Sequence, residues 1–395
     1  MTRSISTLAL VALVVIATTI MSDRPSSVGG GTIDISAASS PPRYLPVERV
    51  FISGHSLVDQ PFPDHLARLS ASAQAPIQWN RQYLPGSSIK ERTRGASSIG
   101  WSGYSRGIDR NGNPIDTLHE IWRPASVDGV YDTLIVTEQH SLLENILRND
   151  TIRYLRDFHE RIVGMNPRAQ TFLYQSWLTV SDLNAPGRWI AYEKAADPVW
   201  ACVVERINLS LAAEGRADRI RALPVALALA TLVETATGSA GVPGISAETR
   251  AATMARLFRD DVHLTDAGSY YIALASFALI HGKPAQGSWA PPGMAHGTAK
   301  ALRHHAWRFA ASRSRFAPMS LSQCRDYVGD RFVPLYLAYQ RDTSWRMGGT
   351  VRTYVNWVRY RIEWPHLFRG ESAANPFYFS PETDRGYWFH QRRNG

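Results

Sequence analysis

The chain has 395 residues, of which 44% are hydrophobic and 19% are charged. Its length and composition exclude a small disulfide-stapled scaffold and predict one large globular domain with an extension. The formal net charge is +9, and from Lys300 to the end 16 Lys and Arg residues stand against 7 Asp and Glu residues. The C-terminal quarter therefore carries the whole excess, which indicates an anionic or membrane surface as a possible partner near that end. We expect no nucleic-acid partner.

The amino terminus has the pattern of an export signal. Arg3 precedes an apolar run of 17 residues from Ile5 to Met21, which is long for a signal-peptide core and short for a membrane-spanning helix. We therefore predict that residues 1–25 form a signal peptide or an N-terminal membrane anchor. A Gly-, Ser- and Pro-rich stretch over 26–45 is typical of a linker. Both alternatives predict an exported protein, either periplasmic or extracellular, or held at a membrane.

Cysteine usage limits the redox and metal chemistry. Cys202 and Cys324 could form one disulfide in an oxidising compartment, but two cysteines cannot make a disulfide framework. The sequence has no CxxC and no Cys/His ligand spacing, so we expect no metal site and no cofactor.

Strand and helix patterns alternate between residues 46 and 285, which we predict to be one domain. The expected strands begin near Val50 and cover 77–84, 131–137, 171–175 and a stretch from 220; the expected helices cover 64–72, 151–163, 189–214 and 265–280. This alternation predicts an α/β fold in three layers, α/β/α, with a parallel sheet covered on both faces. The polar stretch 90–122 is predicted to be a surface insertion that contributes to a binding site.

The remaining residues, 286–395, differ in composition from that domain. Their sequence predicts a basic, aromatic-rich, α-helical C-terminal extension. Its aromatic residues are consistent with a layer packed onto the domain, or with stacking on sugars or lipid headgroups.

Two stretches carry the chemistry. Ser56 follows the first predicted strand after Gly54, so its hydroxyl is expected at the carboxyl end of the sheet, beside the N–H groups of the next helix. Asp260 and His263 lie three residues apart before the last helix of the domain. A serine hydroxyl is a weak nucleophile and needs a base, and this short loop supplies a histidine with a carboxylate to orient it. We predict a Ser56–His263–Asp260 catalytic triad.

The order of these motifs resembles the SGNH/GDSL hydrolase family over about residues 50–281. Gly54-His55-Ser56-Leu57 is similar to the family's first block, and Asp260-Asp261-Val262-His263 is similar to its last, DxxH, block. The resemblance implies a flavodoxin-like three-layer fold and an oxyanion hole built from the N–H groups of Ser56 and Gly86 and the side-chain amide of Gln139.

Two of the family's blocks differ here. Gln139, in Thr137-Glu138-Gln139-His140, stands where the family has an asparagine, and His55 stands where it has an aspartate. His55 and His140 are possible substrate contacts or structural neighbours of the site.

Together these features predict a serine ester hydrolase that removes an O-acyl group, such as acetyl, from an extracellular glycan or a related ester. An O-acyltransferase would use the same Ser, His and Asp residues and is the first alternative. A non-catalytic glycan- or envelope-binding protein on a degenerate fold of the same kind is the second.

Overall fold

The computed structural model describes residues 48–95, 100–122, 129–285, 287, 289–313, 318–346 and 349–389. The predicted signal or anchor and the predicted linker lie outside these residues. The described residues form one compact unit, which includes the predicted C-terminal extension. Among its helices, none combines the length and the apolar character that a membrane span requires.

A five-stranded sheet lies at the centre of the unit, and every pair of neighbouring strands in it is parallel. Its strands in spatial order are β2 (Ile77–Tyr83), β1 (Glu48–Gly54), β3 (Thr133–Thr137), β4 (Gln170–Tyr174) and β5 (Ile220–Leu223). The strand order reverses between β1 and β3, so the crevice outside their carboxyl ends is where a sheet of this kind binds ligands. The sheet confirms the predicted α/β class.

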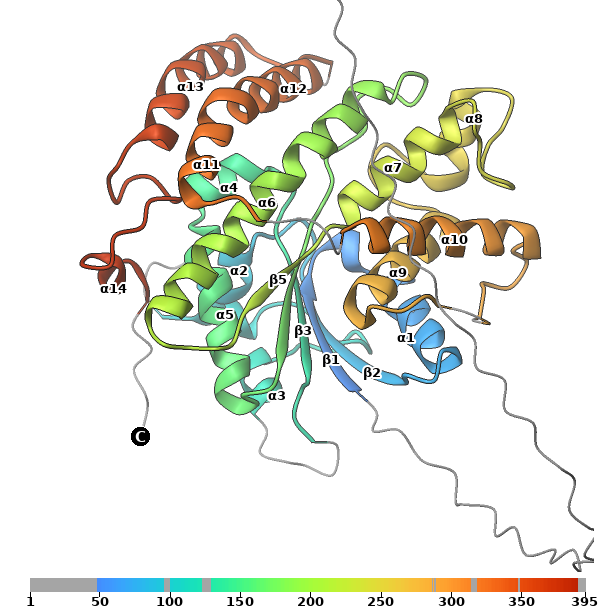
Figure 1. The fold of residues 1–395 in the computed structure, drawn as a ribbon, viewed down its shortest axis with the longest axis horizontal. Coiled ribbons are helices and arrows are strands. Elements are labelled where there is room, and N and C mark those ends of the chain that lie inside the picture. The colour runs from blue at the N-terminus through green and yellow to red at the C-terminus, as the bar shows by residue number, and fades with distance from the viewer. Residues whose placement is uncertain are drawn as a thin grey trace, which may run out of the picture. The chain divides into compact units, whose positions relative to one another are not determined.

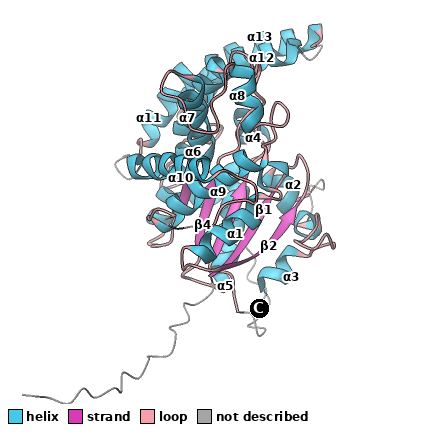
Figure 2. Ribbon diagram, turned by 90° about the vertical axis from the view of Figure 1, so that its right-hand side faces the viewer, coloured by secondary structure: helices cyan, strands magenta, loops and turns pink. Residues whose placement is uncertain are grey.

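Helices cover both faces of the sheet, as Figures 1 and 2 show. In Figure 1, α2 (Ile89–Thr93), α3 (Thr117–Trp122), α5 (Thr151–Met165) and α6 (Gly187–Ala213) lie to the left of the strands, and α1 (Phe62–Ser72), α9 (Asp266–His281) and α10 (His296–Arg313) lie to the right. The helices α4 (Leu142–Arg148), α7 (Val225–Thr237) and α8 (Arg250–Leu257) lie toward the end to which the strands point. This is the predicted three-layer arrangement.

Local sequence explains where the elements begin and end. The α9 helix begins after Thr265, whose side chain accepts a hydrogen bond from the N–H of Gly268. It ends at Gly282, whose φ of 61° suits a residue without a side chain. The strands β1 and β3 are runs of buried residues, as expected for a sheet covered on both sides.

The segment 90–122 differs from the predicted surface insertion. It contains α2, α3 and a 3₁₀ turn, η2 (Ser102–Ser105), and it buries Arg92 and Tyr104 completely. Arg92 can be buried because its guanidinium group donates hydrogen bonds to Ser53, Ser87 and Thr137 inside the domain, and the neighbours of Arg92 in sequence do not reveal these partners.

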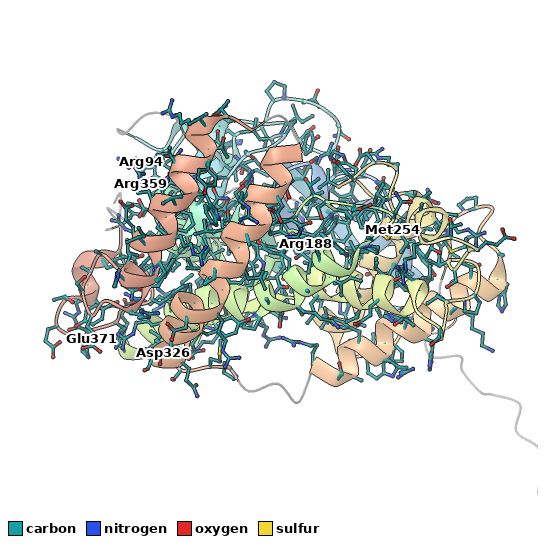
Figure 3. All side chains as sticks on the ribbon, turned by 90° about the horizontal axis from the view of Figure 1, so that it is seen from above. Arg94, Arg188, Met254, Asp326, Arg359 and Glu371 are labelled. Atoms are coloured by element: carbon teal, nitrogen blue, oxygen red, sulfur yellow. A yellow bond between two sulfur atoms is a disulfide. The ribbon has the colours of Figure 1, made fainter. Side chains whose placement is uncertain are left out.

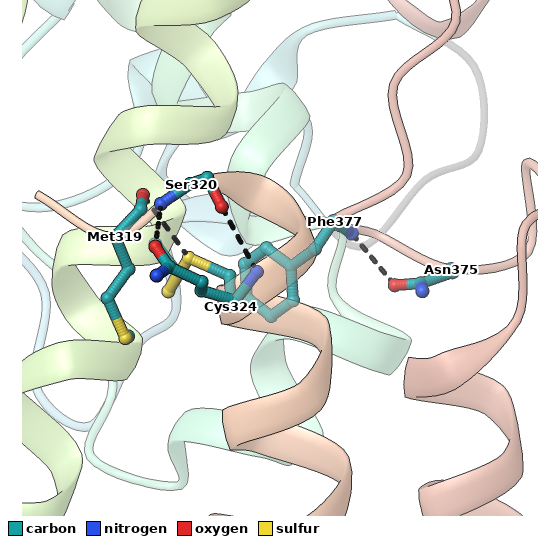
Figure 4. Close-up of a disulfide and its surroundings, with 7 residues drawn as sticks. Met319, Ser320, Cys324, Asn375 and Phe377 are labelled. Carbon is teal, nitrogen blue, oxygen red and sulfur yellow. Dashed lines mark hydrogen bonds between the residues drawn. A yellow bond between two sulfur atoms is a disulfide. The ribbon is translucent and has the colours of Figure 1, made fainter.

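The C-terminal helices form a layer of the same unit. They are α11 (Leu321–Tyr327), a π-helical segment η3 (Val328–Phe332), α12 (Val333–Arg346), α13 (Val351–Arg369) and the short α14 (Asp384–Tyr387). A disulfide joins Cys202 of α6 to Cys324 of α11, with the two Cα atoms 5.8 Å apart (Figure 4). Phe332, Tyr336 and Phe368 are buried in the layer, which favours packing as the role of many of its aromatic residues.

Candidate active site

Ser56 begins a single 3₁₀ turn, η1 (Ser56–Val58), immediately beyond the end of β1. Gly54 permits this sharp turn because a Cβ atom there would lie 2.1 Å from Cγ2 of Val58 and 2.7 Å from Cγ2 of Thr137. The backbone of β1 therefore approaches its neighbours more closely than any other residue type would allow. The turn leaves Ser56 half-buried at the carboxyl edge of the sheet, as the sequence predicts.

The loop between α8 and α9 brings His263 to Ser56. The Nε2 atom of His263 lies 3.1 Å from Oγ of Ser56, and its Nδ1 atom lies 2.8 Å from Oδ2 of Asp260. The other oxygen of Asp260, Oδ1, accepts hydrogen bonds from the N–H groups of Val262 (2.8 Å) and His263 (2.6 Å). Residues 207 positions apart in sequence thus form one hydrogen-bonded chain, Asp260–His263–Ser56.

The carboxylate of Asp260 defines the direction of that chain. Partial burial raises the pKa of Asp260, but hydrogen bonds from the N–H groups of His263 and Val262 and from the imidazole lower it by more, so the pKa lies below its usual value. An ionised carboxylate only accepts hydrogen bonds, so Nδ1 of His263 must carry the proton that faces it. In the neutral ring Nε2 is then the acceptor, and the Ser56 hydroxyl donates to it.

Residues that follow β4 hold the histidine loop in place. The indole Nε1 of Trp177 donates to the carbonyl oxygen of Val262 (2.8 Å), and the N–H of Val180 donates to that of Asp261 (2.7 Å). Within the loop, the N–H of Arg259 donates to the carbonyl oxygen of His263 (2.9 Å). These hydrogen bonds to the carbonyl oxygens of the loop fix its backbone, and the fixed backbone positions the imidazole of His263.

A cavity of about 20 Å³ lies beside Ser56 and His263. This space has room for about one water molecule or a group of similar size. The side chains that line it include Leu57, Pro61, Tyr174, Trp177, Arg259 and Ile272.

The predicted oxyanion residues lie at the ends of the two strands beside β1. Gly86 is exposed in the turn after β2 with a φ of 64°, and the N–H of Leu84 in the same turn donates to the carbonyl oxygen of Gly54 (3.0 Å). Gln139 follows β3, and its Oε1 accepts from the N–H of Ser141 (2.9 Å) and from Nδ2 of Asn145 (2.7 Å). These bonds fix the orientation of the amide, so its NH₂ group points away from both donors. The nitrogen of this NH₂ group, Nε2 of Gln139, lies 3.5 Å from Nε2 of His140.

The two predicted substrate contacts differ in placement. His55 is 1% exposed; its Nε2 lies 3.0 Å from the carbonyl oxygen of Glu138, and its Nδ1 accepts weakly from the N–H of Leu57 (3.5 Å). The structure therefore places His55 beneath the serine turn, as a structural neighbour that substrate does not reach. His140 is half-buried, and burial, and secondarily the nearby charge of His263, lower the pKa of His140.

Sequence reasoning missed a buried polar network beneath these loops. The guanidinium of Arg92 donates to Oγ of Ser53 (3.0 Å), to the carbonyl oxygen and Oγ of Ser87 (both 2.7 Å), and to the carbonyl oxygen of Thr137. It thereby joins the ends of β1, β2 and β3. A signal was present in Ser88 and Glu91, which form a capping box and so mark the helix α2 at the start of the stretch predicted to be a surface insertion.

Glu138 balances the charge of Arg92. Its carboxylate accepts from the N–H groups of Ile89 (3.0 Å) and Gln139 (2.7 Å) and from Oγ1 of Thr151 (2.7 Å). Burial raises the pKa of Glu138, while these hydrogen bonds and the charge of Arg92 oppose that rise. Glu138 thus connects the turn that bears Gln139 to the helix that follows Gly86.

Comparisons with known proteins add little to this geometry. No family model matches the chain, and no curated protein matches it. Among solved structures, the chain is similar to a DUF4886 family protein from Bacteroides uniformis, with a TM-score of 0.45 and 14% sequence identity over 69% of this chain and 98% of that chain.

Proposed function

We propose that this protein is a serine ester hydrolase of the SGNH type that removes a short O-acyl group, such as acetyl, from an extracellular glycan or a related ester. The observation that carries the proposal is the hydrogen-bonded chain from Asp260 through His263 to Ser56. Its tautomer and direction are those that acyl transfer to a serine hydroxyl requires.

The reaction would proceed in two halves. Oγ of Ser56 attacks the acyl carbonyl while its proton passes to Nε2 of His263, and Asp260 stabilises the imidazolium that forms. The ester C–O bond then breaks, and the leaving alcohol takes the proton from Nε2. In the second half a water molecule attacks the acyl-serine and gives a proton to Nε2; the bond from the acyl carbon to Oγ then breaks, Oγ takes that proton back, and the carboxylic acid and free Ser56 are released.

Charge develops on the carbonyl oxygen in both tetrahedral intermediates. Donors for that oxygen are expected from the N–H groups of Ser56 and Gly86 and from the amide of Gln139. Support for the last donor comes from the two hydrogen bonds that already occupy its Oε1 atom.

The proposal is tested with fluorophosphonate labelling and with acyl esters of increasing chain length. Ser56→Ala should abolish both labelling and turnover, and His263→Ala should abolish turnover, with the unfolding transition unchanged. Ser372→Ala, at an exposed serine remote in sequence from the site, is the matched control and should keep full activity. Labelling that persists in Ser56→Ala would overturn the assignment. Release of free acid in water, rather than a new ester of an added alcohol, would distinguish a hydrolase from an acyltransferase.

A further inference from the structure

One helix carries most of the exposed large apolar side chains in the described part of the chain. Of six such side chains, five belong to α13, and the sixth is Trp122 at the end of α3. The exposed fractions on α13 are 81% for Val351, 46% for Tyr354, 57% for Val355, 40% for Val358 and 62% for Ile362. A concentration of this kind on one surface element marks an interaction site.

These side chains form a continuous stripe. Val351, Val355, Val358 and Ile362 recur at intervals of four, three and four residues, which places them on one side of an α-helix. The opposite side of α13 is already used, because Tyr360, Trp364 and Phe368 are buried against the rest of the C-terminal layer. The stripe is therefore a second apolar face that packing among the residues described by the structure does not explain.

Positive charge borders the stripe on both sides. At 100° per residue, Arg352 and Arg359 lie along one edge of the stripe and Arg361 along the other, and all three are exposed. The helix α13 has four arginines and a single acidic residue, Glu363, whose Oε2 lies 3.4 Å from Nε of Arg359. Figure 3 labels Arg359 on this helix, which lies beside α12.

We infer that α13 docks onto the surface of an anionic lipid bilayer. The apolar stripe would enter the boundary between headgroups and acyl chains, and the flanking arginines would extend along it to the lipid phosphates. A second copy of the chain fits the surface less well, because apposed stripes would bring rows of arginine together with one glutamate on each helix to offset them. This inference does not depend on the proposed hydrolase activity.

Docking in this way would place the reaction near the bilayer. In Figures 1 and 2, α12 and α13 lie beyond the end of the sheet toward which the strands point, which is also the end where Ser56 lies.

A single fluorescent probe tests the inference in the full-length chain. Both native cysteines are in the disulfide and no described cysteine is free, so a new cysteine can be labelled selectively. An environment-sensitive dye on Val355→Cys should shift its emission to the blue with phosphatidylglycerol vesicles and should be quenched by brominated acyl chains. The same dye on Ala217→Cys, an exposed position between α6 and β5, is the matched control and should remain in water even if the amino terminus holds the chain at the vesicle.

The charge requirement is tested with the same probe. Arg352→Gln combined with Arg361→Gln should weaken partitioning of the labelled helix by about 25-fold, since each basic residue near an anionic surface contributes about fivefold. Neutral phosphatidylcholine vesicles should give no shift. An unshifted Val355→Cys probe on anionic vesicles would overturn the inference. So would a dimer without lipid that Val355→Asp dissociates, because the stripe would then be a contact between copies.

Discussion

Asp260 acts through each of its two oxygens separately. Oδ1 holds the backbone of its own loop through the N–H groups of Val262 and His263, and Oδ2 accepts from the imidazole of His263. The same carboxylate therefore shapes the loop and selects the tautomer of His263. An asparagine, which has one acceptor oxygen and one donor NH₂ group, could still hold the backbone of the loop but could no longer select the tautomer of His263.

Asp260→Asn should separate these two roles. The amide oxygen can still accept from the backbone, but an NH₂ group facing His263 favours the tautomer that cannot take the serine proton. We expect turnover to fall by up to about 10⁴-fold, with the unfolding midpoint changed little. Measuring kcat beside a denaturation curve checks both points. Near wild-type turnover would mean that the carboxylate does not control the tautomer.

Gln139 is the one expected oxyanion donor that a substitution can remove, because the donors of Ser56 and Gly86 are backbone N–H groups. Gln139→Ala should lower kcat by about 10²–10³ with little change in KM, because the donor meets charge that exists only in the transition state. Gln139→Glu is the matched control, since it keeps the shape and the acceptor for Asn145 but removes the NH₂ donor. Both variants should lose activity, and Gln139→Glu should lose at least as much as Gln139→Ala, because its carboxylate also repels the developing oxyanion. A loss of less than about threefold, well below the usual cost of a lost donor, would mean that Gln139 is not an oxyanion donor and that backbone N–H groups alone form the oxyanion hole.

His55 gives the stability of the fold a pH dependence. Burial, together with the nearby charge of Arg92, lowers the pKa of His55 to about 3. Below about pH 6.5 the unfolded chain gains a proton at this residue and the folded chain does not. The free energy of unfolding should therefore fall as the pH drops from about 6.5 toward 3, by up to about 1.4 kcal/mol per pH unit from this group.

Urea unfolding at pH 7, 6 and 5 measures this slope. His55→Gln should be less stable at pH 7, because it loses a ring fitted between Glu138 and Leu57, but its slope should be shallower than that of the wild type. His304→Gln, at an exposed histidine of α10, serves as the comparison and should keep the wild-type slope. Equal slopes in all three proteins would show that burial of His55 does not contribute.

At the scale of the element, the turn after β1 depends on a close approach of the backbone to two side chains. Gly54→Ala places a Cβ atom 2.1 Å from Cγ2 of Val58 and 2.7 Å from Cγ2 of Thr137, so the turn must shift. We expect a loss of about 1–3 kcal/mol in the free energy of unfolding. Turnover should fall as well, because Ser56 is the second residue beyond the glycine. Gly164→Ala within α5, where a Cβ atom has nothing within 4 Å, should cause neither loss.

At the scale of the whole molecule, the C-terminal layer is tied to the domain covalently and through the site loops. The hydroxyl of Tyr339 on α12 donates to the carbonyl oxygen of Thr179 (2.6 Å) and accepts from the N–H of Ser181 (3.1 Å). The residue between them, Val180, holds Asp261 in the histidine loop. The layer thus supports the loop that bears His263 at the candidate active site.

Replacing Cys202 and Cys324 by serine tests the covalent link. The disulfide closes a loop between residues 122 positions apart, so its removal should lower the free energy of unfolding by about 2–5 kcal/mol. Turnover of a small ester should be retained where the variant is folded, since neither cysteine lies in the hydrogen-bonded chain. Equilibrium unfolding with and without reductant measures the effect, and reductant should not change the variant. Equal stability of variant and wild type would mean that packing alone holds the layer.

Much of this architecture follows from local patterns in the sequence. Apolar runs bounded by Gly, Pro and polar residues predict the strands and helices, because burial on a pleated or helical surface imposes its period on neighbouring residues. The positions of Ser56, Asp260 and His263 after or between such elements predict that they meet at one edge of a parallel sheet.

Only the tertiary structure decided which polar and apolar groups are buried. Arg92 and Glu138 have the appearance of surface residues in the sequence, yet they are fully buried because partners on β1, β3 and α5 satisfy them. The sequence leaves His55 as a possible substrate contact. In the structure its Nε2 atom is hydrogen-bonded to the carbonyl oxygen of Glu138, 83 residues away in sequence. The apolar face of α13 is exposed because the opposite face already packs within the protein. Whether a side chain is buried depends on contacts between segments that are distant in sequence, and the hydrophobic periodicity of a single segment does not contain that information.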